Sequence, residues 1–140
     1  MAKLFNVPII STAQVPKAFG PTIKELNDLY TNFGDVKQHV KSDFSMLEQP
    51  VLDYLTNLKR SKVVIYGIEA HVCVKQTCLD LIERNYEVHI VVDSISSMSY
   101  HDRNTGIEAM RDAGAHVTTF QSLAFELARN PGIPQYKELL

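Results

Sequence analysis

A cysteine, Cys73, follows closely on a segment whose pattern changes from strand to helix. Residues 62–66 form a short β-branched apolar run, which indicates a strand covered on both faces, and Gly67 ends it. Apolar positions then recur at helical spacing over residues 72–84, which predicts a helix closed by Asn85 as a left-handed cap. Cys73 is therefore expected in the first turn of that helix.

A thiol at the start of a helix can act as a nucleophile. Unpaired backbone N–H groups and the positive end of the helix dipole favour the thiolate, which is the reactive form of cysteine. The same N–H groups can hold an oxyanion during acyl transfer. The alternative is that Cys73 is a small buried apolar residue, as most free cysteines are. Cys78 falls in the apolar stripe of the helix, so we interpret it as a core residue.

Length and composition predict an ordinary globular domain. The chain has 140 residues, of which 45% are hydrophobic and 21% charged, and its net charge is −2. This charge gives no electrostatic reason to expect nucleic acid or a membrane surface as a partner, and no apolar run reaches the length of a membrane span. The two cysteines form no redox pair or disulfide framework. We therefore expect a reducing compartment, namely a cytoplasmic location, with a mitochondrial or peroxisomal association left open.

Strands and helices alternate along the whole chain, which predicts an α/β fold with a parallel sheet. The expected strands cover residues 7–12, 35–41, 62–66, 87–92 and 116–119, and the expected helices cover residues 22–29, 50–58, 72–84, 99–113 and 122–129. Ligands of such sheets bind beyond the carboxyl ends of the strands. Lys41, Cys73 and Asp93 are each expected just past such an end, which favours a functional role for Cys73.

Three motifs resemble those of a known enzyme family. They are GIEAHVCV at residues 67–74, followed by Thr77 and Asp80; KSDFSM at residues 41–46; and TAQVPKAFG at residues 12–20. In this order they resemble the isochorismatase-like cysteine hydrolases, and most closely their eukaryotic branch, the isochorismatase domain-containing proteins. The resemblance covers essentially the whole chain.

The resemblance implies a fold and a set of catalytic residues. The fold would be a three-layer αβα domain over residues 1–140, with a mostly parallel sheet. Cys73 would be the nucleophile of an Asp–Lys–Cys triad, and Lys41 would hold the thiolate and orient the substrate. The peptide between Ile68 and Glu69 would be cis, and the N–H groups of Val72 and Cys73 would face the oxyanion. The reaction would be hydrolysis of a small amide or cleavage of a vinyl ether.

This chain departs from the family pattern in three ways. No Asp-x-Gln motif supplies the aspartate of the triad, and Ala13 stands where the branch has a glutamate. The first strand of the family, which is central in its sheet, is missing, so two half-sheets with unpaired edges are expected and the domain would be N-terminally incomplete. Three explanations compete: the protein is longer than this sequence, which we favour; a partner chain supplies the strand; or the two halves close directly.

Other polar residues near the motifs have competing interpretations. The resemblance places Gln14, His71 and Phe44 at the substrate pocket, and a pocket-wall role for His71 is favoured over a role as catalytic base. Glu69 either orients the substrate or caps the helix, and Asp93 is expected to bind the loop that follows it. The histidines lack metal-ligand spacing, so we expect no metal and no cofactor.

Two hypotheses from different classes remain. The first is a cysteine hydrolase that acts on a small molecule and forms a homo-oligomer, a dimer or a tetramer. The second is a catalytically impaired pseudoenzyme that acts as a binding or scaffold protein, because the triad aspartate is absent. Exposed aromatic residues in the 19–33 region would contribute to the contact between protomers.

Overall fold

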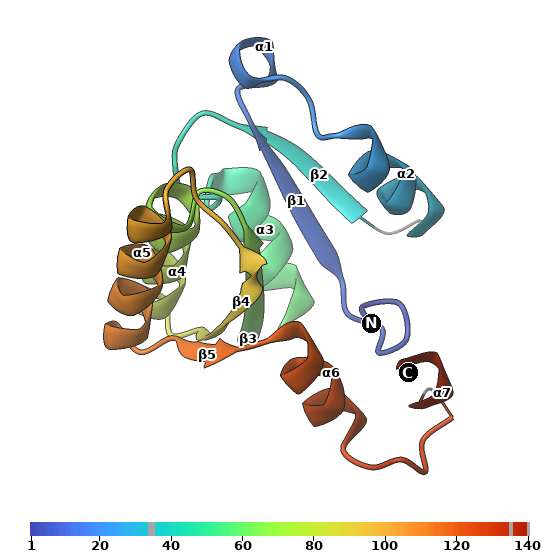
Figure 1. The fold of residues 1–140 in the computed structure, drawn as a ribbon. Helices are drawn as coiled ribbons and strands as arrows, with labels where there is room; N and C mark the ends of the chain where they lie inside the picture. Colours follow the sequence, from blue (N-terminus) through green and yellow to red (C-terminus); the bar gives the residue numbers. More distant parts are fainter. Residues whose placement is uncertain (34–35, 135, 140) are drawn as a thin grey trace.

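A computed structural model describes residues 1–33, 36–134 and 136–139, and strands and helices alternate through them (Figure 1). The strands are β1 (Ile9–Gln14), β2 (Val36–Lys41), β3 (Lys62–Gly67), β4 (Glu87–Ile95) and β5 (His116–Thr118). The helices are α1 (Pro16–Phe19), α2 (Lys24–Phe33), α3 (Gln49–Leu58), α4 (Lys75–Glu83), α5 (Tyr100–Asp112), α6 (Phe120–Ala128) and α7 (Tyr136–Leu139), with a π-helical turn, η1 (Ala70–Val74), before α4. Residue 35 of the second expected strand lies outside the described residues.

The strands form two separate parallel sheets. β1 pairs with β2, with Ile9 opposite Val36 and Gln14 opposite Lys41. β3 pairs with β4, and β4 with β5, in the order β3-β4-β5. Parallel pairing puts the carboxyl ends of neighbouring strands together, so Gln14 and Lys41 end the smaller sheet side by side, and Gly67 lies opposite Ile95 at the end of the larger one.

The expectation of two half-sheets is confirmed. No ladder joins β1 to β3 within the described ranges, so β1 and β3 each have one edge without a partner strand (Figure 1). A direct closure of the two halves, which was one of the three explanations, is therefore wrong for this structure. The other two explanations both supply a strand, from a longer chain or from a partner, and stay open.

Helices cover both faces of the larger half-sheet, which gives the expected αβα layers. Val88 and Ile90 of β4 pack in a core with α3, α4 and α5. Val91, which points to the opposite face because side chains alternate along a strand, is buried on the side where α6 contacts β4. The buried residues of the main core are Val51, Leu55, Ile65, Ala70, Val74, Cys78, Leu81, Val88, Ile90, Ile95, Met110 and Ala115.

Local signals in the sequence explain several helix boundaries. The expected capping box at the start of α5 is present, since the Asp102 N–H donates to the Ser99 hydroxyl at 3.0 Å. α3 has a proline in its first turn and ends at Lys59 in the left-handed conformation. α6 begins after Thr119, whose side chain accepts from the Ser122 N–H.

The prediction for Asp93 is wrong. β4 continues to Ile95, so Asp93 lies within the strand rather than past its end. Its carboxylate accepts a 2.9 Å hydrogen bond from the Phe120 N–H at the start of α6, and not from the loop that follows it. Asp93 therefore ties β4 to a helix N-terminus, where a carboxylate is favourable.

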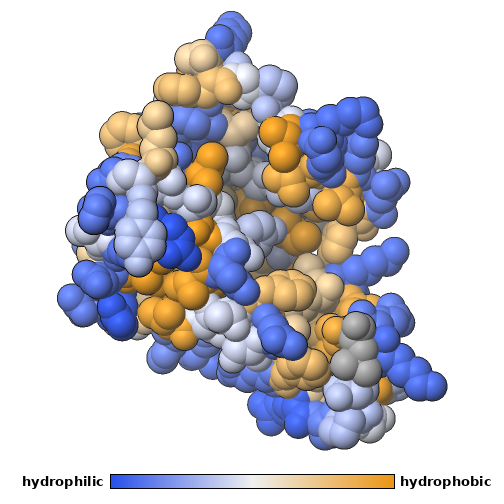
Figure 2. Space-filling view, in the orientation of Figure 1, coloured by the Kyte–Doolittle hydropathy of each residue, from blue (hydrophilic) through white to orange (hydrophobic). Residues whose placement is uncertain are grey.

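Helix α2 and the segment before it present apolar side chains to the surface. Phe19 of α1 is 78% exposed, and Ile23 before α2 and Leu26 and Leu29 on α2 are also exposed. Figure 2 shows apolar residues gathered over this part of the molecule. Leu26 and Leu29 are three residues apart and so lie on the same side of α2. With Ile23 just before the helix, they remain exposed in the described part of the chain.

Candidate active site

Cys73 lies at the expected edge of the larger half-sheet. β3 ends at Gly67, whose φ of 128° is a conformation that favours glycine. The peptide between Ile68 and Glu69 is cis, where the family resemblance places one. The chain then enters η1, which contains Cys73, and the Cys73 residue is partly exposed. The expected helix over residues 72–84 thus begins as a π-helical turn, a feature frequent at functional sites.

The amide of Val72 has a partner within the turn. Its N–H donates to the Glu69 carbonyl at 3.1 Å, and the Val74 N–H donates to the same carbonyl at 3.1 Å. The Val72 N–H is thus engaged within the turn, and its expected role as a donor to the oxyanion stays a prediction. The Ala70 N–H donates to the Ser96 carbonyl at 2.9 Å and fixes the start of the turn against the end of β4.

Lys41 is buried at the end of β2, with 5% of its surface exposed. Its ammonium group donates to the side-chain oxygen of Gln14 and to the carbonyl oxygens of Asp43 and Phe44, at 2.7 and 2.9 Å respectively for the two carbonyls. An ammonium group has three donors, so all of them are used. Among the described residues no carboxylate lies within ion-pair distance of Lys41.

Glu48 organises the same loop from its other end. The residues 42–48 that follow β2 are called the lysine loop here. The Glu48 carboxylate accepts from the Ser42 N–H at 2.7 Å and from the Asp43 N–H at 3.1 Å. These two backbone hydrogen bonds, with a smaller contribution from Lys41, hold the pKa of Glu48 below its ordinary value. The loop is thus fixed at both ends by charged side chains.

One hydroxyl connects the lysine loop to the cysteine turn. Thr77 on α4 is 2% exposed, and its hydroxyl donates to the Cys73 carbonyl at 2.7 Å. The same oxygen accepts from the Met46 N–H at 2.9 Å. Lys41 and Cys73 belong to different half-sheets, and Thr77 joins the segments that carry them.

The loop after β4 covers the other side of the turn. The Met98 N–H donates to the Glu69 carboxylate at 2.8 Å, and His71 Nδ1 lies 3.0 Å from the Ser97 hydroxyl. Glu69 therefore binds a neighbouring loop, and its side chain does not cap the helix as one interpretation had it. His71 is turned toward Ser97, which supports a place in the wall of the site.

Exposed apolar side chains surround this edge. Phe44 of the lysine loop, Ile68 of the cis peptide and Met98 after β4 are 54%, 68% and 96% exposed. These exposures are high for large apolar residues, which monomeric proteins rarely gather at one place without a function. An apolar ligand group would find contacts at this edge.

The second cysteine has a different environment. Cys78 is fully buried in the core, and this burial raises the pKa of its thiol to about 11. Its thiol therefore stays protonated at neutral pH. The described residues contain no group of three or more His, Cys, Asp or Glu side chains arranged to hold a metal. In the same residues, no helix is long and apolar enough to cross a bilayer.

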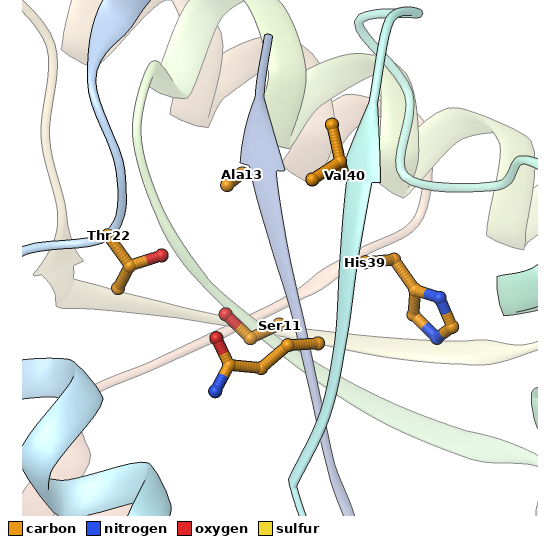
Figure 3. Close-up of a pocket in the computed structure, with 6 residues that line it drawn as sticks. Ser11, Ala13, Thr22, His39 and Val40 are labelled. Carbon is orange, nitrogen blue, oxygen red and sulfur yellow. The ribbon is translucent and has the colours of Figure 1, made fainter. Parts of the chain in front are cut away.

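A small cavity of about 90 Å³ lies elsewhere, beside β1 and β2 (Figure 3). Its lining includes Ser11 and Ala13 of β1 and Thr22 before α2. Side chains alternate across a strand, so Ser11 and Ala13 face away from the side of β1 that carries Gln14. Lys41, the partner of Gln14, is therefore on the opposite face of this half-sheet, and the cavity is separate from the candidate site.

The sequence indicated some residues of this site and missed others. Lys41, Gln14 and the lysine loop are held together, and His71, Glu69 and Cys73 share one turn. Glu48 and Ser97 were missed as site residues, and Thr77 appeared only as part of a motif. A threonine four residues after the cysteine lies about one helical turn away from it. This spacing predicts a hydrogen bond from the threonine hydroxyl to the cysteine carbonyl.

The chain matches a known family model. Residues 1–122 match the model described as the isochorismatase domain. A relative from Phytophthora sojae, described as a secreted isochorismatase effector, is 41% identical over 99% of this chain and 67% of its own length. Isochorismatase domain-containing protein 2 of Xenopus laevis is 37% identical over 99% of this chain and 65% of its own length.

A solved structure agrees closely with the fold. The structure described as the MAR1 ribonuclease from Caenorhabditis elegans is 38% identical and superposes with a TM-score of 0.90. The match covers 99% of this chain and 70% of that one. The chain thus spans about two thirds of the length of the curated relatives it matches.

Proposed function

Because this chain belongs to the isochorismatase family, with the hydrolase fold of that family, we propose that it is a hydrolase with Cys73 as nucleophile. The observation that carries the proposal is the placement of Cys73 in a π-helical turn between two fixed loops. The lysine loop is tied to the turn through Thr77, and the loop after β4 is tied to it through Glu69. Such fixed surroundings are what a catalytic group requires.

The proposed substrate class, which the family resemblance implies, is a small amide. In the first step the Cys73 sulfur bonds to the carbonyl carbon, and the thiol proton passes to the leaving nitrogen as the C–N bond breaks. In the second step water attacks the thioester, its hydroxyl becomes part of the carboxylic acid, and its proton returns to sulfur. A vinyl-ether substrate is the alternative, with the same cysteine.

In this proposal Lys41 acts by its charge and by its hydrogen bonds to the lysine loop, and it does not bind the substrate. Its three donors already bind Gln14 and two backbone carbonyls, so it shapes the lysine loop and contributes a buried positive charge. A buried charge acts more strongly than one in water, and it would stabilise the thiolate and the oxyanion. The Cys73 N–H remains the proposed backbone donor to the oxyanion, while Gln14, Phe44 and His71 would contact the substrate.

One observation favours the second hypothesis, a catalytically impaired binding protein. No carboxylate pairs with Lys41 in the described part of the chain, so the acid that normally accepts the thiol proton has no counterpart there. Losing a general base commonly lowers the rate by two to four orders of magnitude, roughly. Any turnover that depends on Cys73 would eliminate this hypothesis.

The experiment compares Cys73→Ala with Cys78→Ala on a panel of small primary amides and vinyl ethers. We expect Cys73→Ala to abolish ammonia or product release and Cys78→Ala to retain it in the folded protein. Unchanged turnover in Cys73→Ala on every accepted substrate would contradict the proposal.

The remaining proposals concern assembly and location. We propose a homo-oligomer, supported by the exposed apolar side chains of Leu26 and Leu29 on α2 and of Ile23 just before it. Analytical ultracentrifugation of the wild type and of Leu29→Glu would test it, since a monomer in the wild type would contradict it. A cytoplasmic location is likewise a proposal.

A further inference from the structure

We propose that Thr77 is a positioning residue of the active site, because its hydroxyl sets the lysine loop relative to the Cys73 turn. This inference rests on the proposed role of Cys73 as nucleophile. Thr77 touches neither the thiol nor, in the proposal, the substrate. It acts through the backbone of Cys73 on one side and the backbone of Met46 on the other.

The hydroxyl is used as both donor and acceptor. It donates to the Cys73 carbonyl at 2.7 Å and accepts from the Met46 N–H at 2.9 Å. A threonine in a helix often donates to the carbonyl four residues earlier. The second bond is different, since it reaches a segment 31 residues away in sequence. A hydroxyl that served only the helix would not need that partner.

The contact is buried and lies next to the residue that carries the thiol. Thr77 is 2% exposed, so water cannot replace either bond. Cys73 lies in η1, where the backbone follows a π-helical pattern and the Cys73 carbonyl gains a side-chain partner. Holding that carbonyl fixes the peptide plane next to the thiol-bearing Cα.

The contact also crosses between the two halves of the molecule. The lysine loop follows β2 in the smaller half-sheet, and η1 follows β3 in the larger one. In the described ranges, the Met46–Thr77 bond is the one hydrogen bond that joins the lysine loop to the η1–α4 segment. Without it, no hydrogen bond in the described ranges would join the lysine loop to the segment that carries Cys73, and small displacements of catalytic groups cost large factors in rate.

The test uses three substitutions. Thr77→Val keeps the shape and removes the hydroxyl, whereas Thr77→Ser keeps the hydroxyl. Thr56→Val is the control, because the Thr56 hydroxyl on α3 likewise donates to the carbonyl four residues earlier, that of Leu52, at 2.8 Å, and within the described residues it makes no hydrogen bond to the lysine loop. Each variant is measured under conditions in which it is fully folded.

The main measurement is the rate of Cys73 alkylation by iodoacetamide at neutral pH, read by mass spectrometry, with turnover of an accepted amide beside it. We expect Thr77→Val to lower both rates by at least about tenfold, since the thiol and Lys41 lose their fixed relationship. Thr77→Ser should stay within about threefold of the wild type, and Thr56→Val should be unchanged. A purely structural role of Thr77 would lower the unfolding free energy but leave the alkylation rate of the folded protein unaltered.

The outcomes separate this inference from the proposed function. Wild-type alkylation and turnover in Thr77→Val would overturn the inference, even if Cys73→Ala is inactive. Unchanged turnover in Cys73→Ala would overturn the proposed function itself. If Thr77→Val does not fold, Thr77→Ala takes its place, because it also removes the hydroxyl and has a smaller side chain.

Discussion

Gly106 on α5 lies directly against the backbone of His71 in the cysteine turn. A Cβ at Gly106 would be 2.8 Å from the Cα and the N of His71, and 2.9 Å from the carbonyl carbon of Ala70. Side-chain carbons essentially never approach backbone atoms so closely. The absence of a side chain at Gly106 is therefore what allows α5 to support the turn that carries Cys73.

Gly106→Ala should destabilise the protein and displace the cysteine turn. Helix propensity alone favours alanine over glycine by about 1 kcal/mol. The clash with backbone atoms opposes this gain, and overpacking costs about 1–3 kcal/mol. Urea unfolding should therefore show a lower free energy of unfolding, and Cys73 alkylation should slow in the folded variant. The exposed neighbour Thr105 provides the control as Thr105→Ala, and a stabilised Gly106→Ala would contradict the close approach.

Lys41→Met should cost more stability than a surface lysine would. The substitution leaves the Gln14 side-chain oxygen and the carbonyls of Asp43 and Phe44 without their donor. A hydrogen bond to a charged group contributes about 1.5–3 kcal/mol. The control is Lys62→Met, because Lys62 forms an exposed ion pair with Glu87 and such pairs contribute less than about 1 kcal/mol. Equal losses of unfolding free energy in the two variants would show that Lys41 is not held as described.

Glu48 should make the stability of the protein depend on acid pH. Its pKa in the folded protein is lowered by hydrogen bonds from the Asp43 and Ser42 N–H groups. A group with a depressed folded pKa stabilises the protein above its unfolded pKa, and this stabilisation is lost as the pH falls through the folded value. The free energy of unfolding of the wild type should therefore exceed that of Glu48→Gln most at neutral pH. This difference should become smaller below the ordinary glutamate pKa of about 4.3. If the urea midpoints of the two proteins differ by the same amount at every pH, this prediction is contradicted.

The unpaired edges of β1 and β3 should be visible in hydrogen exchange. β4 has a partner strand on both sides, whereas the amides of β1 and β3 that point away from β2 and β4 have no ladder partner among the described residues. We expect native-state exchange followed by NMR to show slow amides in β4 and an alternating pattern of fast and slow amides in β1 and β3. Uniform protection along both strands would mean that a strand or a second copy covers these edges in solution.

The arrangement of elements was accessible from the sequence because it depends on local patterns. Apolar runs predicted strands close to β3 and β4, and the Ser99 capping box predicted the start of α5. Cys73 was expected at the start of a helix, and the chain indeed turns there after Gly67. The motifs also placed Lys41 at the end of β2.

The partners of single polar groups were not accessible, because they depend on how distant segments pack. Asp93 binds the start of α6, and Glu69 binds the loop after β4. Both contacts join residues that are more than twenty positions apart, and nothing in the local pattern selects one acceptor over another. Glu48 is close in sequence to Ser42 and Asp43, whose N–H groups it accepts from. This spacing predicts the contact only if the loop is known to fold back on itself before α3.

The most direct test of the account is the rate of iodoacetamide alkylation of Cys73 at pH 7, measured in the folded protein and in the same chain unfolded in urea. If the site is assembled, the folded thiol should react at least about tenfold faster than the unfolded one, and Lys41→Met should remove the difference. Cys78 should show the opposite behaviour, because its burial in the core and its raised pKa protect it until the chain unfolds. A folded Cys73 that reacts no faster than the unfolded one would contradict a primed nucleophile in this chain and favour the binding-protein hypothesis.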